Sequence, residues 1–163
     1  MPTIHVAGDG HVTPIPLADG TTWGPYTDKK VRRTLDQALY ILKHNIRGVK
    51  PCNKCFAALP GGRTFDDVFD DATVFVSFDP SGPNSGVTDA VGGREITISV
   101  SEFQGGRWTV AATLVHELAH VNGASATTAD AEKSLKCCGL SGLFRPGAIG
   151  MEEDDRLVGP RYA

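Results

Sequence analysis

The sequence lacks a block of basic residues, a long apolar run and, in its first residues, the pattern of a secretory signal peptide. With 16 Lys and Arg against 19 Asp and Glu, its formal net charge is −3, which argues against a nucleic-acid partner because phosphate binding uses clustered cations. No apolar run approaches the roughly 18 residues of a membrane-spanning helix. The stretch from Met1 to His5 lacks the basic-then-apolar pattern of a signal peptide. We therefore expect that a signal was removed, that the protein stays inside the cell, or that it leaves by another route.

The 163 residues are enough for one domain with a substantial core. The 19 glycines and 10 prolines predict that much of the chain is loop. We therefore expect residues 1–163 to form a single α+β domain that begins with an irregular arm over residues 1–27. His5 and His11 lie in this arm, and we expect both to be solvated.

The spacing of apolar residues locates the regular elements. Helical spacing marks one early and one late segment, and strict alternation marks the better of two strands. No internal repeat is visible. The expected elements, in chain order, are a helix (28–46), a short helix or turn with solvent-facing aspartates (56–73), a strand (74–78), a loop (79–93), a strand (95–100), a central apolar helix, and a helix from 127 or 128 to about 138.

Four cysteines occur as two pairs, Cys52 with Cys55 and Cys137 with Cys138. Adjacent residues on a helix diverge by about 100°, so Cys137 and Cys138 would chelate one metal ion poorly. A redox Cys-x-x-Cys usually follows a strand, whereas a helix and a turn are expected before Cys52. We predict two cross-links between the pairs, with four reduced cysteines as the alternative. Disulfides imply an oxidising compartment, and so export or secretion without a visible signal; a cytoplasmic location is the alternative.

The segment from Thr113 to Gly123 contains His-Glu-x-x-His within an apolar run. On a helix, His116 and His120 lie on one face, so both imidazoles can bind one zinc ion. Glu117 lies beside them, where its carboxylate can take the proton of a water that the zinc acidifies. The pattern is the signature of zincin metallopeptidases. The alternative is a pair of structural histidines on a half-buried helix.

A catalytic zinc ion normally has three protein ligands, so a third must be found. The metzincin pattern would place it at position 126, but Ala126 cannot bind metal. Two acidic residues follow, Asp130 and Glu132. They lie about 200° apart on a helix, so only one of them should face the metal. Glu132 would make the chain a glutamate zincin with a short spacer.

The segment after the motif resembles the aspzincin group, the deuterolysin-like peptidases. Their zinc-binding Asp lies in a Gly-Thr-x-Asp-x-x-Tyr-Gly segment. This chain has Thr127-Thr128-Ala129-Asp130 there, with Lys133-Ser134 in place of Tyr-Gly. Over residues 113–134, the resemblance implies that His116, His120 and Asp130 bind zinc and that Glu117 is the general base. Glu132 would then face away and pair with Lys133 or Lys136.

The missing tyrosine leaves the residue that stabilises the oxyanion open. The candidates are Tyr26, Arg94, Arg161 and Tyr162.

The resemblance implies a zinc-dependent peptidase acting on a peptide or protein, in a zincin-like domain. A short sheet, an active-site helix and a following ligand-bearing helix would form its core. We expect the strand at 95–100 to form the rim of the cleft and to pair with an extended substrate. Two alternatives are an exported bacterial effector or toxin peptidase acting on cell-wall or host substrates, and a non-catalytic zinc-stabilised interaction domain with His5 or His11 as fourth ligand. The sequence specifies neither cleavage preference nor oligomeric state.

Overall fold

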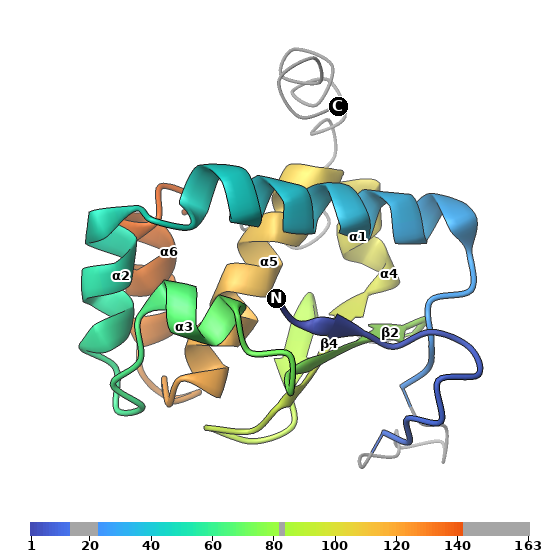
Figure 1. The fold of residues 1–163 in the computed structure, drawn as a ribbon, viewed down its shortest axis with the longest axis horizontal. Helices are drawn as coiled ribbons and strands as arrows, with labels where there is room; N and C mark the ends of the chain where they lie inside the picture. The colour runs from blue at the N-terminus through green and yellow to red at the C-terminus, as the bar shows by residue number, and fades with distance from the viewer. Residues whose placement is uncertain (14–22, 82–83, 142–163) are drawn as a thin grey trace.

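The computed structural model describes residues 1–13, 23–81 and 84–141, and it has an α+β fold as expected (Figure 1). No helix in these three ranges is both long and apolar enough to cross a membrane. The helices are α1 (Lys29–Ile41), the π-helical turn η1 (Leu42–Ile46), α2 (Lys50–Ala57), α3 (Phe65–Phe69), α4 (Val100–Gln104), α5 (Arg107–Val121) and α6 (Asp130–Cys137). The strands are β1 (Thr3–Ile4), β2 (Phe75–Asp79), β3 (Gly86–Thr88) and β4 (Glu95–Ser99).

The four strands form one sheet in the order β1-β2-β4-β3. The first three are parallel, and β3 is antiparallel to β4. The strands predicted at 74–78 and 95–100 are confirmed as β2 and β4. The rim expected at 95–100 is wrong, because β4 pairs with β2 on one side and with β3 on the other, which leaves it no free edge. The edge strand next to β4 is β3, which lies in the segment predicted as loop; β1 forms the opposite edge.

The helix predicted at 28–46 is confirmed as α1 followed by η1. The side chain of Asp28 accepts a hydrogen bond from the backbone N–H of Val31 and caps the start of α1. In Figure 1, α1 crosses the top of the molecule, the sheet lies below it, and α5 runs between them. This position explains why α5 is apolar nearly all round. Leu114, Val115 and Leu118 are completely buried on it.

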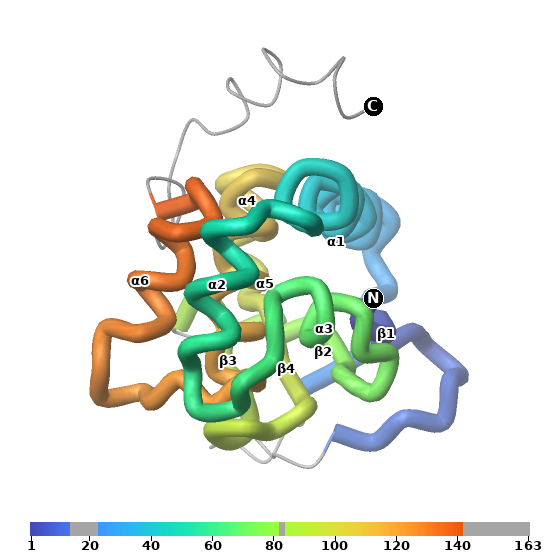
Figure 2. Tube along the Cα trace, turned by 60° about the vertical axis from the view of Figure 1, so that its left-hand side comes forward, coloured from blue at the N-terminus to red at the C-terminus, as the bar shows by residue number. Residues whose placement is uncertain are grey.

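Two disulfides join α2 to the end of α6, Cys52 to Cys138 and Cys55 to Cys137. The predicted cross-links between the two pairs are confirmed, and Cys52 and Cys55 lie on the helix α2. They are three residues apart, so they share one face of α2. The two helices lie side by side in the turned view (Figure 2). The end of α6 is therefore fixed to a helix that lies more than eighty residues earlier in the chain.

Part of the N-terminal arm joins the sheet as β1. The expectation that both histidines of the arm are solvated is wrong. His5 is buried, and its Nδ1 lies 3.1 Å from the Ser77 hydroxyl. The ring of His11 stacks on Phe75 with centroids 3.7 Å apart, and its Nε2 lies 2.9 Å from a Glu95 carboxylate oxygen. The cause is the pairing of β1 with β2, which brings the arm into contact with residues of β2 and β4. Residues 14–22 of the arm lie outside the described residues.

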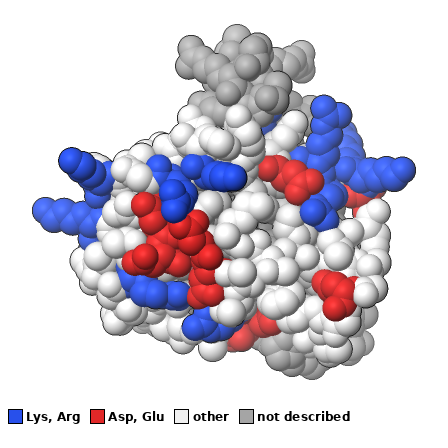
Figure 3. All heavy atoms as spheres, viewed as in Figure 1, with Lys and Arg blue, Asp and Glu red and all other residues white. Residues whose placement is uncertain are grey.

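The acidic run around α3 is largely a surface feature, as expected. Figure 3 shows acidic side chains gathered over α3 with basic side chains around them. Thr64 and Asp67 form a reciprocal capping box at the start of this short helix. Arg47 pairs with Asp70 at 2.6 Å, and both side chains are about half exposed.

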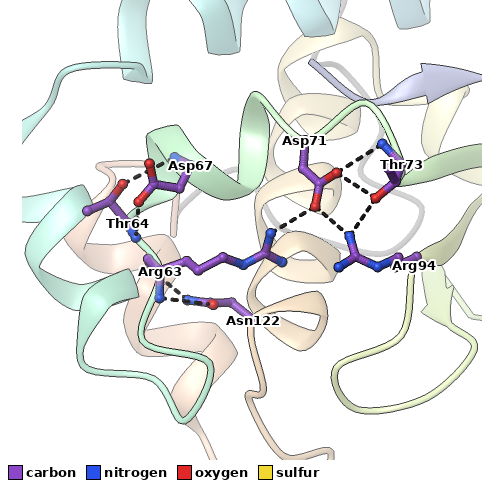
Figure 4. Close-up of polar contacts among 7 residues, drawn as sticks. All are labelled: Arg63, Thr64, Asp67, Asp71, Thr73, Arg94 and Asn122. Atoms are coloured by element: carbon purple, nitrogen blue, oxygen red, sulfur yellow. Dashed lines mark hydrogen bonds and ion pairs between the residues drawn. The ribbon is translucent and has the colours of Figure 1, made fainter.

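Asp71 differs from the other aspartates of this run because its side chain is only 15% exposed. It accepts hydrogen bonds from Arg63 at 2.8 Å, from Arg94, and from the backbone and hydroxyl of Thr73 (Figure 4). Burial raises the pKa of the Asp71 carboxyl, but the bonds from Thr73, Arg63 and Arg94 outweigh burial and hold the pKa far below its ordinary value. The expectation of a solvent-facing carboxylate is wrong here.

Arg63, which pairs with Asp71, also contacts Asn122 at the end of α5. Asn122 follows the last residue of α5, and its side-chain amide donates to the carbonyls of Phe56 and Arg63, both at 2.8 Å (Figure 4 shows Asn122 beside Arg63). The backbone carbonyl of Asn122 also accepts from the N–H of Gly61 at 2.8 Å. Asn122 is buried, so these bonds are shielded from water. They fix the C-terminal end of the helix that carries the His-Glu-x-x-His motif.

Candidate metal centre

The motif lies on the last two turns of α5, as its apolar frame predicts. The helix ends at Val121, and Gly123, two residues further on, has a φ of +93°, which suits glycine after a helix end. His116 and His120 share one face, with ring centroids 4.8 Å apart. One ligand atom from each of His116, Glu117 and His120 lies within 4.8 Å of the other two. Within the described part of the chain, this His-Glu-His group could hold a metal ion.

His120 is held with its outer nitrogen available. Its Nδ1 lies 2.8 Å from the carbonyl oxygen of Ala124. A carbonyl can only accept, so Nδ1 is the donor, and in the neutral imidazole Nε2 therefore keeps its lone pair. A backbone carbonyl that fixes the tautomer in this way is the usual support of a histidine that binds metal.

His116 lies between two carboxylates. Its Nδ1 is 3.2 Å from Glu117 Oε1, and its Nε2 is 3.2 Å from Glu132 Oε1. Burial lowers the pKa of the His116 imidazole, but the bonds and charges of Glu117 and Glu132 outweigh burial and raise it. For Glu132, burial raises the carboxyl pKa, while its own backbone N–H and the His116 contact outweigh burial and lower it. The two carboxylates therefore favour a positive charge at His116.

Of the two acidic candidates for the third ligand, Glu132 lies at the motif and Asp130 lies away from it. Asp130 accepts from the Thr128 hydroxyl at 2.9 Å and lies 3.7 Å from the Lys133 ammonium. It lines a separate hollow with residues of α2, including Cys55. The expected pairing of Glu132 with Lys133 or Lys136 is not seen. The reason is where α6 begins. Its first residue is Asp130, and Glu132, its third residue, faces His116 on α5.

Glu117 is held by a residue that the sequence analysis missed. Only 3% of Glu117 is exposed, and its Oε2 accepts a 2.6 Å hydrogen bond from the Thr88 hydroxyl on β3. Gly86 allows this close approach, because a Cβ there would come within 2.9 Å of Thr113 and 3.0 Å of the Glu117 side chain. The sequence contains a faint signal of this strand in Val87 and Thr88, two β-branched residues that follow a glycine.

A pocket of about 310 Å³ opens over the motif. The strand β3 forms one wall. In the antiparallel pairing, Asp89 donates to Glu95 and Ser99 donates to Ser85. Backbone groups alternate along a strand, so those of Gly86 and Thr88 point away from β4. The lining residues are Gly86, Val87, Thr88, Ala90, Val91, His116, Glu117, His120 and Ala126.

The described candidates for oxyanion stabilisation lie elsewhere. Tyr26 is buried and donates its hydroxyl to the Ser77 carbonyl at 3.0 Å, and burial raises its pKa well above the ordinary value. Arg94 pairs with Asp71. Neither lines the pocket. Arg161 and Tyr162 lie outside the described residues.

The geometry defines a His-Glu-His centre on one helix, under a pocket walled by an antiparallel edge strand. Comparison with known proteins adds nothing to this description. No protein-family model matches the chain, and neither the curated proteins nor the solved structures contain a match.

Proposed function

We propose that this chain is a zinc-dependent peptidase. The observation that carries the proposal is that His116 and His120 share one face of α5 while the buried Glu117 lies beside them in the same pocket. Two imidazoles four residues apart with an intervening glutamate are the donor set and base of zincin peptidases. The proposal keeps the predicted zincin class and revises the expected aspzincin ligand set.

The ligands of the zinc ion in this proposal are His116, His120 and Glu132. Imidazole nitrogen and carboxylate oxygen suit zinc. Two ligands of a tetrahedral zinc ion lie about 3.3 Å apart, given bonds of roughly 2.0–2.1 Å. His116 Nε2 and Glu132 Oε1 are 3.2 Å apart. Glu132 is therefore preferred to Asp130, whose carboxylate contacts Thr128 and Lys133.

A zinc ion held there supplies Lewis acidity that polarises the scissile carbonyl and acidifies the attacking water. Glu117 accepts the proton that this water loses and then returns it to the leaving amine. Thr88 holds one oxygen of the Glu117 carboxylate at 2.6 Å, and the other lies 3.2 Å from His116. The base is therefore oriented before a substrate arrives, which lowers the entropic cost of the reaction.

The free edge of β3 is the proposed substrate rim, in place of the strand at 95–100. The backbone groups of Gly86 and Thr88 that point away from β4 can pair with an extended peptide. Such a peptide would run along one wall of the pocket, with a bond over His116 and His120. This arrangement makes a peptide or a protein the substrate that the site fits best.

The two disulfides support work in an oxidising compartment. We propose an exported peptidase on this ground, which is compatible with an effector or toxin. The interaction-domain alternative required His5 or His11 as fourth ligand. These residues instead contact Ser77, Phe75 and Glu95 at the first strands.

Glu117→Gln tests the proposal, with Glu95→Gln as a matched control outside the pocket. Glutamine keeps the shape of Glu117 but cannot accept the proton of the water. The variant should keep its metal and lose about 10²–10⁴-fold in turnover of a denatured protein substrate. The control should lose little. Equal turnover of the wild type and Glu117→Gln would remove Glu117 from the mechanism.

A further inference from the structure

We propose that Val91 determines the specificity of this site. It selects peptides that place an apolar side chain of about valine to leucine size next to the scissile bond, and it rejects charged side chains there. This inference rests on the proposed peptidase function. It adds the substrate class and a residue that controls it.

Val91 lies on a tight turn that is hydrogen-bonded to α5. The N–H of Gly93 donates to the carbonyl of Ala90 at 2.8 Å, which closes a four-residue turn with Val91 in its second position. Gly92 has a φ of +77°, which suits glycine at the third position. The N–H of Gly92 also donates to the carbonyl of His120 at 2.9 Å. Val91 is therefore held beside the second histidine of the motif.

Val91 is 56% exposed although it is apolar and well anchored. A single exposed valine is ordinary on a surface, but this one lines the pocket over the motif. Ala90 and Ala126 line the same pocket. They come from the same turn and from the segment between α5 and α6, so apolar groups lie on two sides. A substrate side chain entering here would cover Val91 and remove apolar surface from water.

Among the described residues that line the pocket, none offers a charged substrate side chain a partner outside the proposed mechanism. Its charged or chargeable lining residues are His116, Glu117 and His120, which the proposed mechanism uses. A charge buried without a partner is strongly disfavoured. The volume of about 310 Å³ is at the lower end of the range for ligand pockets, roughly 300–1,000 Å³. It suits one side chain together with the reacting peptide bond.

The strand geometry places this side chain near the scissile bond. Side chains of an extended peptide alternate between the two faces of its strand. A peptide paired with β3 would send one set towards α5, on the side where Thr88 reaches Glu117. Val91 lies three residues beyond Thr88 and beside His120. The substrate residue that meets Val91 is therefore close to the bond over the histidines.

The test is a library of blocked hexapeptides with one variable position, Leu, Val, Lys or Glu, in a background of Ala, Gly and Gln. Zinc-loaded wild type should cleave the Leu and Val peptides at least about 10-fold faster than the Lys and Glu peptides. Val91→Asp should shift preference towards Lys, and Val91→Lys towards Glu, each by about 10-fold relative to the wild type. Val12→Asp is the matched control, because Val12 is 81% exposed outside the pocket, and its profile should be that of the wild type.

Unchanged preference in both Val91 variants, with their metal content and melting temperature preserved, would overturn the inference. Failure of wild type to cleave any peptide would instead count against the proposed function. The inference is then decided by binding of the same peptides to zinc-loaded Glu117→Gln, measured by calorimetry. Tighter binding of Leu and Val peptides that Val91→Asp abolishes supports it, and equal binding of all four overturns it.

Discussion

The hydroxyl of Thr88 lies 2.6 Å from Oε2 of Glu117 and also 3.2 Å from the Glu117 backbone carbonyl. One side chain of the edge strand therefore contacts both the carboxylate and the backbone of the proposed base. Since Thr88 belongs to β3 and Glu117 to α5, the contact joins the proposed substrate rim to the helix that carries the His-Glu-x-x-His motif. The position of β3 relative to α5 therefore fixes the orientation of the Glu117 carboxylate.

Thr88→Val should lower turnover by about 10-fold while metal content stays unchanged. Valine has the shape of threonine but cannot donate, and a hydrogen bond to a charged group contributes roughly 1.5–3 kcal/mol. Thr88→Ser keeps the hydroxyl and should restore most of the rate. The measurement is kcat and KM on one peptide, and the loss should appear in kcat. A loss confined to KM, or no rescue by serine, would contradict this role.

Glu132→Ala should weaken zinc binding far more than Asp130→Ala. A change in a residue that only supports a ligand typically costs 10–100-fold in metal affinity, so loss of a direct ligand should cost more than that. Asp130 contacts Thr128 and Lys133, and its loss should cost little. Competition with a chelator measures both affinities. A large loss in Asp130→Ala alone would restore the aspzincin ligand set.

Removal of the disulfides should lower both stability and metal affinity. Each bridge joins α2 to α6, the helix that carries Glu132. Loss of a native disulfide from a small domain typically costs about 2–5 kcal/mol. The double variant Cys55→Ser, Cys137→Ser, which removes one of the two bridges, should therefore melt at a lower temperature and bind zinc more weakly than the wild type. Adding a reductant to the wild type should reproduce both effects; an unchanged zinc affinity would show that α5 holds α6 without them.

Asp71→Asn should destabilise the fold by about 1–2 kcal/mol. Hydrogen bonds to a charged group are strong, but Arg94 is half exposed, so solvent weakens its contribution. Folding lowers the pKa of Asp71 below its unfolded value of about 3.9. The stabilisation is therefore complete above that pH and is lost as the pH falls below about 4.

Urea unfolding of wild type and Asp71→Asn between pH 3 and pH 7 checks this sign. The stability difference between the two should shrink on the acid side. Asp36→Asn is the control, because Asp36 forms an exposed pair with Arg32 and should change stability by less than about 0.5 kcal/mol. A difference between wild type and Asp71→Asn that is constant over the whole pH range would contradict the assignment.

The helices and two strands could be predicted from the sequence because each has a local periodic signal. The helix at 28–46 has both a cap and an apolar stripe, and the strand at 95–100 alternates strictly. The disulfides were predictable because Cys137 and Cys138 are adjacent and suit a single metal ion poorly. His116, Glu117 and His120 share a helix face by spacing alone.

The rest of the site depends on contacts between segments far apart in the chain, which no local pattern encodes. The strand β3 is three residues long and lies in a glycine-rich stretch, so it is too short to show an alternating pattern in the sequence. That strand is needed to see that β4 has no free edge. The facing of Glu132 towards His116 depends on where α6 begins, and a shift of one or two residues changes the ligand. His11 could not be placed because its partner Glu95 lies 84 residues away.

The most direct test of the central claim is the metal content of the purified chain. Elemental analysis of protein purified without added metal, then dialysed against zinc, should give about one zinc ion per chain. The double variant His116→Ala, His120→Ala should hold none, because both imidazoles that share the face of α5 are removed. Less than about a tenth of a zinc ion per wild-type chain after dialysis, or equal zinc in wild type and variant, would contradict the account.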